Sequence, residues 1–128
     1  MLQIRLIDNG YCRFFENKKE LLENLPEKKP LYKNTNLSPY AGHVNIVCNN
    51  EEEDPLHVAP LLIKKIQDHK QEIGCHTFSH YYCLEPGQTV EDFKADLQAA
   101  KKIAAKYNVS LKSFVFPRNQ YNEAYLNV

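Results

Sequence analysis

Two histidines separated by three residues are the clearest sign of chemistry in this sequence. His76 and His80 begin and end the string HTFSH, which follows a short apolar segment. If the chain turns helically after His76, both imidazoles lie on one face and can reach a single metal ion at about 2.0–2.1 Å. The alternative is two histidines that are neighbours by coincidence and share no ligand. A zinc-protease site is excluded, because its general base is a glutamate directly after the first histidine, where this sequence has Thr77.

A second candidate site follows another apolar segment, SFVF at 113–116. Pro117 stiffens the turn after this segment, so backbone N–H groups can point at a developing oxyanion. Arg118 can bind a carboxylate or a sugar hydroxyl. Tyr82, which follows HTFSH closely, can stack on a sugar ring. Taken alone, the same proline and arginine are more typical of an ordinary strand-to-loop turn with a solvated arginine.

Both candidate sites need elements that bring them together. Apolar spacing and capping residues predict strands at about 4–7, 72–78 and 113–117, and helices at about 18–25, 60–70 and 90–107. Strands that alternate with helices indicate an α/β fold with parallel strands, whose carboxyl ends meet at one edge. The intervening stretch at 27–54 is expected to be a long irregular excursion with a short strand at 43–47.

Composition and charge exclude several classes of protein. The 16 Lys and Arg residues balance 16 Asp and Glu residues, so no general attraction to nucleic acid or to an anionic membrane is expected. No apolar run is long enough to cross a bilayer, and the start of the chain lacks a secretory signal, so we expect a cytoplasmic protein with four reduced cysteines. The four glycines form no phosphate-binding loop, which argues against a nucleotide-dependent enzyme.

From Glu72 to Leu126 the sequence resembles the polysaccharide deacetylases, which are metal-dependent carbohydrate esterases that remove N- or O-acetyl groups. EIGCHTFSH matches the family's H-[ST]-x-x-H motif, and SFVFPRNQ occupies the position of its strand-and-proline motif. The resemblance implies a distorted parallel (β/α) barrel that holds one divalent metal, expected to be zinc, on an aspartate and two histidines. His76 and His80 would be the histidine ligands. Pro117 and Arg118 would lie beside an acetylated carbohydrate substrate.

The sequence departs from the family pattern at the first motif, which is a strand that ends in two aspartates. Asp8-Asn9 has a similar outline, with Asp8 in the position of the catalytic base and Asn9 in place of the metal ligand. The order of elements favours a true motif before residue 1, and the general-acid histidine is expected beyond Val128. No catalytic residue is therefore assigned. Residues 1–128 are expected to form a single partial deacetylase domain with negligible activity alone, and its unpaired sheet edges favour self-association.

Two other functions remain open at this level. The first is a non-catalytic carbohydrate-binding or interaction module on the same fold, in which tyrosines stack on sugar rings; the candidates are Tyr81, Tyr82, Tyr121 and Tyr125. The second is a small structural zinc domain that uses Cys75, His76, His80 and Cys83. Adjacent side chains on a strand point to opposite faces, which makes a site shared by Cys75 and His76 unfavourable.

Overall fold

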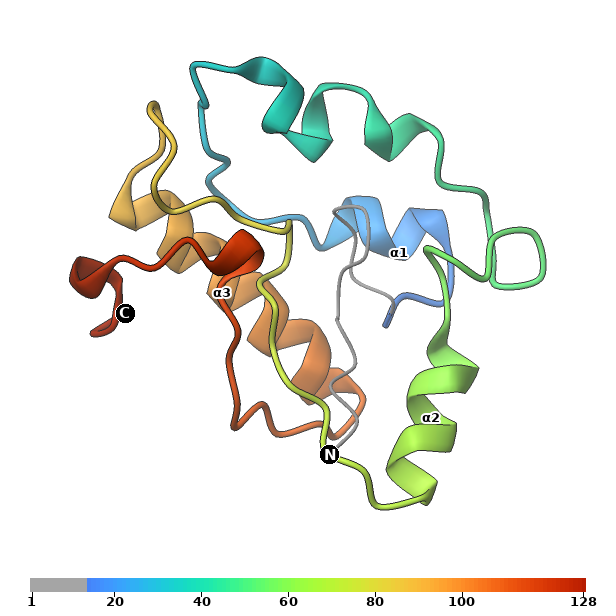
Figure 1. Ribbon diagram of the computed structural model, residues 1–128. Helices are drawn as coiled ribbons and strands as arrows, with labels where there is room; N and C mark the ends of the chain where they lie inside the picture. The colour runs from blue at the N-terminus through green and yellow to red at the C-terminus, as the bar shows by residue number, and fades with distance from the viewer. Residues whose placement is uncertain (1–13) are drawn as a thin grey trace.

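The computed structural model describes residues 14–128. In this range the α-helices are α1 (Lys18–Glu23), α2 (Pro60–Asp68) and α3 (Val90–Lys106), as Figure 1 shows. Short 3-10 helices lie in the irregular parts: η1 (Thr35–Leu37), η2 (Pro39–Ala41), η3 (His43–Asn45), η4 (Pro117–Asn119) and η5 (Glu123–Tyr125). None of the described helices is long and apolar enough to span a membrane. The strand expected at 4–7 and the Asp8-Asn9 pair lie outside the described residues.

The three predicted helices begin where their capping residues indicate. The Asn17 side chain accepts a hydrogen bond from the Glu20 N–H at 2.8 Å and starts α1. Helix α2 begins at Pro60, whose missing N–H costs nothing in the first turn. Thr89 and Asp92 form a reciprocal capping box at the start of α3.

Helix α3 covers the core with a face of small residues. Its buried side chains are Phe93, Ala95, Asp96, Ala99, Ala100, Ile103 and Ala104. Alanines let neighbouring segments approach the helix closely, and most of this face packs in one apolar cluster with residues of α1, α2 and the segment at 73–78. Leu97 and Tyr107 lie at the margin of this face and are only partly buried.

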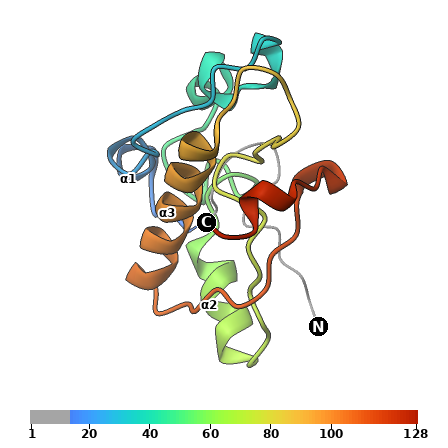
Figure 2. The ribbon, with the colours of Figure 1, turned by 90° about the vertical axis from the view of Figure 1, so that its left-hand side faces the viewer.

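Two extended segments run side by side next to α3, as the two views of the ribbon agree (Figures 1 and 2). They meet in a parallel bridge between Cys75 and Phe114. The Cys75 N–H donates to the Ser113 carbonyl at 2.8 Å, and the Val115 N–H donates to the Cys75 carbonyl at 2.9 Å. The predicted parallel pairing is thus present in the described residues as one bridge, between a segment that precedes α3 in the chain and a segment that follows it. The described residues do not show a (β/α) barrel.

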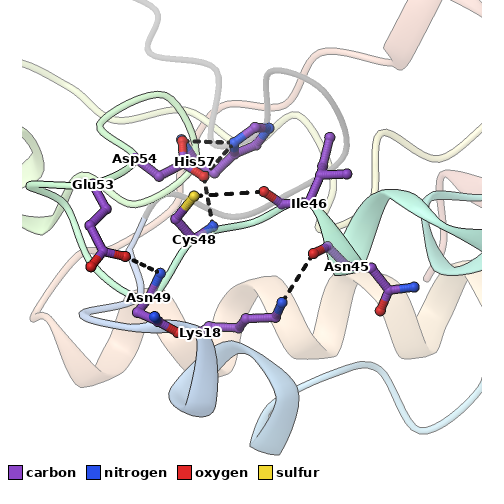
Figure 3. Close-up of polar contacts among 8 residues, drawn as sticks. All are labelled: Lys18, Asn45, Ile46, Cys48, Asn49, Glu53, Asp54 and His57. Carbon is purple, nitrogen blue, oxygen red and sulfur yellow. Dashed lines mark hydrogen bonds and ion pairs between the residues drawn. The ribbon is translucent and has the colours of Figure 1, made fainter.

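The predicted strand at 43–47 is wrong. His43–Asn45 forms η3, and the Asn45 N–H donates to the Gly42 carbonyl at 3.0 Å. Val44 and Val47 both pack toward the core, and their spacing of three residues fits a tight turn better than the alternation of a strand. The following loop is held by Asp54, which accepts the Cys48 N–H at 3.0 Å (Figure 3).

Candidate functional site

The two histidines of HTFSH lie close together. His76 is buried and 8 % exposed, and His80 is half-buried. Their ring centroids are 5.0 Å apart, with an interplanar angle of 69°. Two imidazoles that bind one tetrahedral zinc through Nε2, at about 2.1 Å each, have ring centroids about 5 Å apart. The separation of the rings therefore fits a shared metal ion.

Hydrogen bonds orient both imidazoles. His76 Nδ1 lies 2.8 Å from the Val115 carbonyl oxygen. Because a carbonyl can only accept, Nδ1 carries the proton, and Nε2 of the neutral ring keeps the lone pair that a metal needs. His80 Nδ1 lies 3.0 Å from the Tyr82 hydroxyl oxygen. Metal binding through His80 Nε2 requires that this Nδ1 donates to the hydroxyl.

The loop that carries the histidines has an unusual backbone. Thr77 has a φ of 67° and His80 a φ of 54°, so the helical turn expected after His76 is replaced by left-handed residues. A left-handed φ is strained for a β-branched residue such as Thr77. The Tyr81 N–H donates to Thr77 Oγ1 at 2.8 Å and closes the turn. This turn brings the two rings to the same side of the loop.

A buried carboxylate of α3 holds the same loop from beneath. Asp96 is 1 % exposed and accepts the Phe78 N–H at 2.6 Å and the Ser79 N–H at 3.1 Å. The Ser79 hydroxyl also donates to Asp96. Burial raises the pKa of Asp96 to about 6, although these hydrogen bonds offset part of the rise. Asp96 was not predicted as a functional residue, yet its position on an otherwise apolar helix face was a usable signal.

The predicted substrate corner lies next to the histidines. Pro117 is buried and begins η4, while Arg118 is exposed and has a left-handed φ of 52°. The Arg118 guanidinium carbon lies 4.9 Å from the centroid of the Tyr82 ring. The Tyr82 ring in turn lies 5.2 Å from the His80 ring, centroid to centroid. The structure therefore brings all five sequence-predicted site residues into one region.

The irregular segment before α2 contributes a residue that sequence reasoning missed. The Tyr32 hydroxyl accepts the Tyr82 N–H at 3.0 Å, and burial raises the pKa of Tyr32, so the hydroxyl stays protonated. Gly87 lets this segment approach: it has a φ of 95°, and a Cβ there would lie 2.0 Å from the Leu31 carbonyl oxygen. No local pattern in the sequence marks Tyr32 as a support of the site.

The other tyrosines differ in their access to a ligand. Tyr81 and Tyr125 are buried, and both hydroxyls donate to Gln88 Oε1, at 2.8 Å and 2.7 Å. Tyr121 is 49 % exposed and packs edge-on against Phe116. Sugar stacking is thus open to Tyr121, whereas Tyr81 and Tyr125 serve the packing of the C-terminal segment.

The structural zinc site suggested by sequence proximity does not form. Among residues 14–128, no three side chains of His, Cys, Asp or Glu gather closely enough to hold a metal ion. Cys83 Sγ donates to the Gln120 carbonyl at 3.0 Å, and Cys75 is a buried free thiol whose pKa burial raises to about 11. The same finding means that no third His, Cys, Asp or Glu side chain of residues 14–128 joins His76 and His80 in such a group.

Comparisons with known proteins give one match. The family model described as polysaccharide deacetylase matches residues 15–128. The comparisons with curated proteins and with solved structures find no match.

Proposed function

The chain belongs to the polysaccharide deacetylase family, and from this premise we propose that it serves the metal-dependent hydrolysis of N- or O-acetyl groups on a carbohydrate. The family consists of hydrolases that act on acetylated carbohydrates. The observation that carries the proposal is the pair of imidazoles at HTFSH, with ring centroids 5.0 Å apart.

In this proposal His76 and His80 hold one divalent ion through their Nε2 atoms. The Val115 carbonyl fixes the tautomer of His76 that ligation needs. Imidazole nitrogens suit zinc, which prefers four ligands in a tetrahedron. Such an ion, when bound, activates a water molecule as the nucleophile and polarises the acetyl carbonyl. A third protein ligand has to come from outside residues 14–128.

In this proposal Arg118 and the corner at Pro117 bind and orient the sugar, and Tyr82 supports Arg118. Arg118 presents a planar set of donors beside the histidines, and it can hydrogen-bond a sugar hydroxyl or carboxylate. Tyr82 supports the guanidinium through its ring. The corner at Pro117 is rigid, which favours fixed backbone donors for the oxyanion of the acetyl group.

Zinc titration of the purified chain by calorimetry tests the metal site. We expect weak binding by the wild type, because two imidazoles leave half of a tetrahedral shell to water. H76A and H80A should each abolish it. H69A is the matched control: the His69 Nδ1 bonds to the Lys65 carbonyl on α2, away from the loop. Zinc affinity that is unchanged in H76A and H80A would rule out the site.

A sugar-binding module without catalysis is the second candidate function. The two-ligand set of the described residues favours it, as does the exposed Tyr121. Binding of acetylated oligosaccharides that survives H76A and H80A, without acetate release, supports this candidate. For the deacetylase proposal we expect negligible acetate release by these 128 residues alone. Robust acetate release by the chain, with metal retained through purification, would contradict the view that the chain lacks part of the metal-binding and catalytic residues.

A further inference from the structure

The conformation of the loop from His76 to His80 depends on contacts with residues outside the loop. It contains two left-handed residues, Thr77 and His80, and such conformations persist only where their surroundings over-determine them. One internal hydrogen bond, from the Tyr81 N–H to Thr77 Oγ1, closes the turn. The middle of the loop, Phe78 and Ser79, is buried, so its backbone N–H groups need partners from elsewhere.

Asp96 supplies those partners. Its Oδ1 accepts the Phe78 N–H and its Oδ2 accepts the Ser79 N–H, at 2.6 Å and 3.1 Å. The Ser79 hydroxyl adds a third hydrogen bond to Oδ2. All three donors lie between His76 and His80 in the chain. An ion-paired partner for this carboxylate is absent among the described residues, so neutral donors of the loop offset part of the cost of its burial.

We propose that Asp96 is a positioning residue that sets the metal affinity of His76 and His80 by fixing the backbone between them. This inference rests on the proposed metal site and adds to it a residue outside both motifs. The Asp96 side chain acts through the backbone of Phe78 and Ser79. A carboxylate is required, because one oxygen serves each N–H, and an amide of the same shape offers a single acceptor oxygen.

The experiment measures zinc affinity by calorimetry on folded protein, with the folded fraction checked by circular dichroism at the same temperature. D96N should lower zinc affinity about 10-fold, in the range seen when supports of metal ligands are removed. S79A removes the hydroxyl donor and keeps both backbone bonds, so it should give a smaller loss. I103A is the matched control, since Ile103 is buried on the same helix and should lower stability without changing zinc affinity.

The outcomes separate this inference from the proposed function. If D96N and S79A fold and bind zinc with wild-type affinity, the proposed role of Asp96 is overturned. If H76A loses zinc binding in the same experiment, the proposed metal site still stands. Failure of the wild type to bind zinc overturns both. An equal loss of affinity in I103A would assign the effect to general destabilisation and also overturn the inference. If D96N does not fold, the zinc affinities of S79A and I103A are compared instead. A loss of affinity in S79A but not in I103A supports the inference, and equal affinities overturn it.

Discussion

Two loops of this molecule are each held by hydrogen bonds to one buried aspartate, and the two aspartates have different hydrogen-bond partners. Asp96 holds the HTFSH loop at 76–80 through three neutral donors of Phe78 and Ser79. Asp54 holds the loop before α2, where it accepts the Cys48 N–H and faces the His57 imidazole at 2.9 Å (Figure 3). Both side chains are less than 9 % exposed. The difference lies in the partners: Asp96 receives backbone N–H groups and a serine hydroxyl, whereas Asp54 also contacts an imidazole ring.

The pKa of each carboxyl reflects the balance between its burial and its hydrogen-bond partners. Burial is the largest single influence on both and raises the pKa. For Asp54, the Cys48 N–H and the His57 ring together outweigh burial, so its pKa falls below the ordinary 3.8. For Asp96 the neutral donors offset only part of the effect, and its pKa rises to about 6. Two buried carboxylates that both accept backbone N–H groups can therefore have pKa values shifted in opposite directions. Their contributions to the free energy of unfolding then depend on pH with opposite sign.

The largest predicted effect is a pH dependence that belongs to Asp96. A raised folded-state pKa means that its contribution to the free energy of unfolding is complete below pH 3.8 and is lost as pH rises through about 6. A pKa difference of this size corresponds to about 3 kcal/mol. Urea unfolding of the wild type and D96N from pH 4 to 7 should show this decline in the wild type only. Parallel profiles for the two proteins would break the comparison.

The next effect in size concerns the other loop. D54N removes the charged acceptor of Cys48 and His57, and we expect it to lower the free energy of unfolding by about 2 kcal/mol at pH 7. The contribution of Asp54 is present above pH 3.8 and is lost as pH falls through its lowered pKa. Zinc affinity should stay at the wild-type value in D54N. A loss of zinc affinity as large as that of D96N would show that the two loops are not independent.

The smallest effect on stability is expected beside the HTFSH loop, at Arg118. Arg118 is exposed and stacks on Tyr82, a contact worth about 0.5 kcal/mol in the free energy of unfolding. R118A should therefore change the urea midpoint little, while it weakens binding of an acetylated oligosaccharide measured by titration. K64A on α2 is a control that removes an exposed cation elsewhere. Equal oligosaccharide affinity in wild type and R118A would remove Arg118 from the substrate site.

Local signals in the sequence were enough for the helices and for the convergence of the two motifs. Asn17 and Thr89 mark helix starts that the structure reproduces, because capping depends on residues within one turn. The parallel pairing beside α3 followed from the order of strand, helix and strand. These features require no knowledge of distant residues.

The features that escaped prediction depend on distant partners. Asp96 lies 17 residues from Ser79, and Tyr32 lies 50 residues from Tyr82, so no local spacing reveals either contact. The strand expected at 43–47 failed because a short apolar alternation also fits a tight turn when no second strand pairs with it. The acid on the apolar face of α3 was the one visible sign of a buried contact.

Histidine-selective ¹H–¹⁵N correlation spectra test whether the two imidazoles of HTFSH share one ion. On zinc addition we expect the Nε2 resonances of His76 and His80 to shift together, with the same zinc dependence. The ring resonances of His57 and His69 should not move. A shift at only one of the two HTFSH histidines, or at neither, would contradict the account.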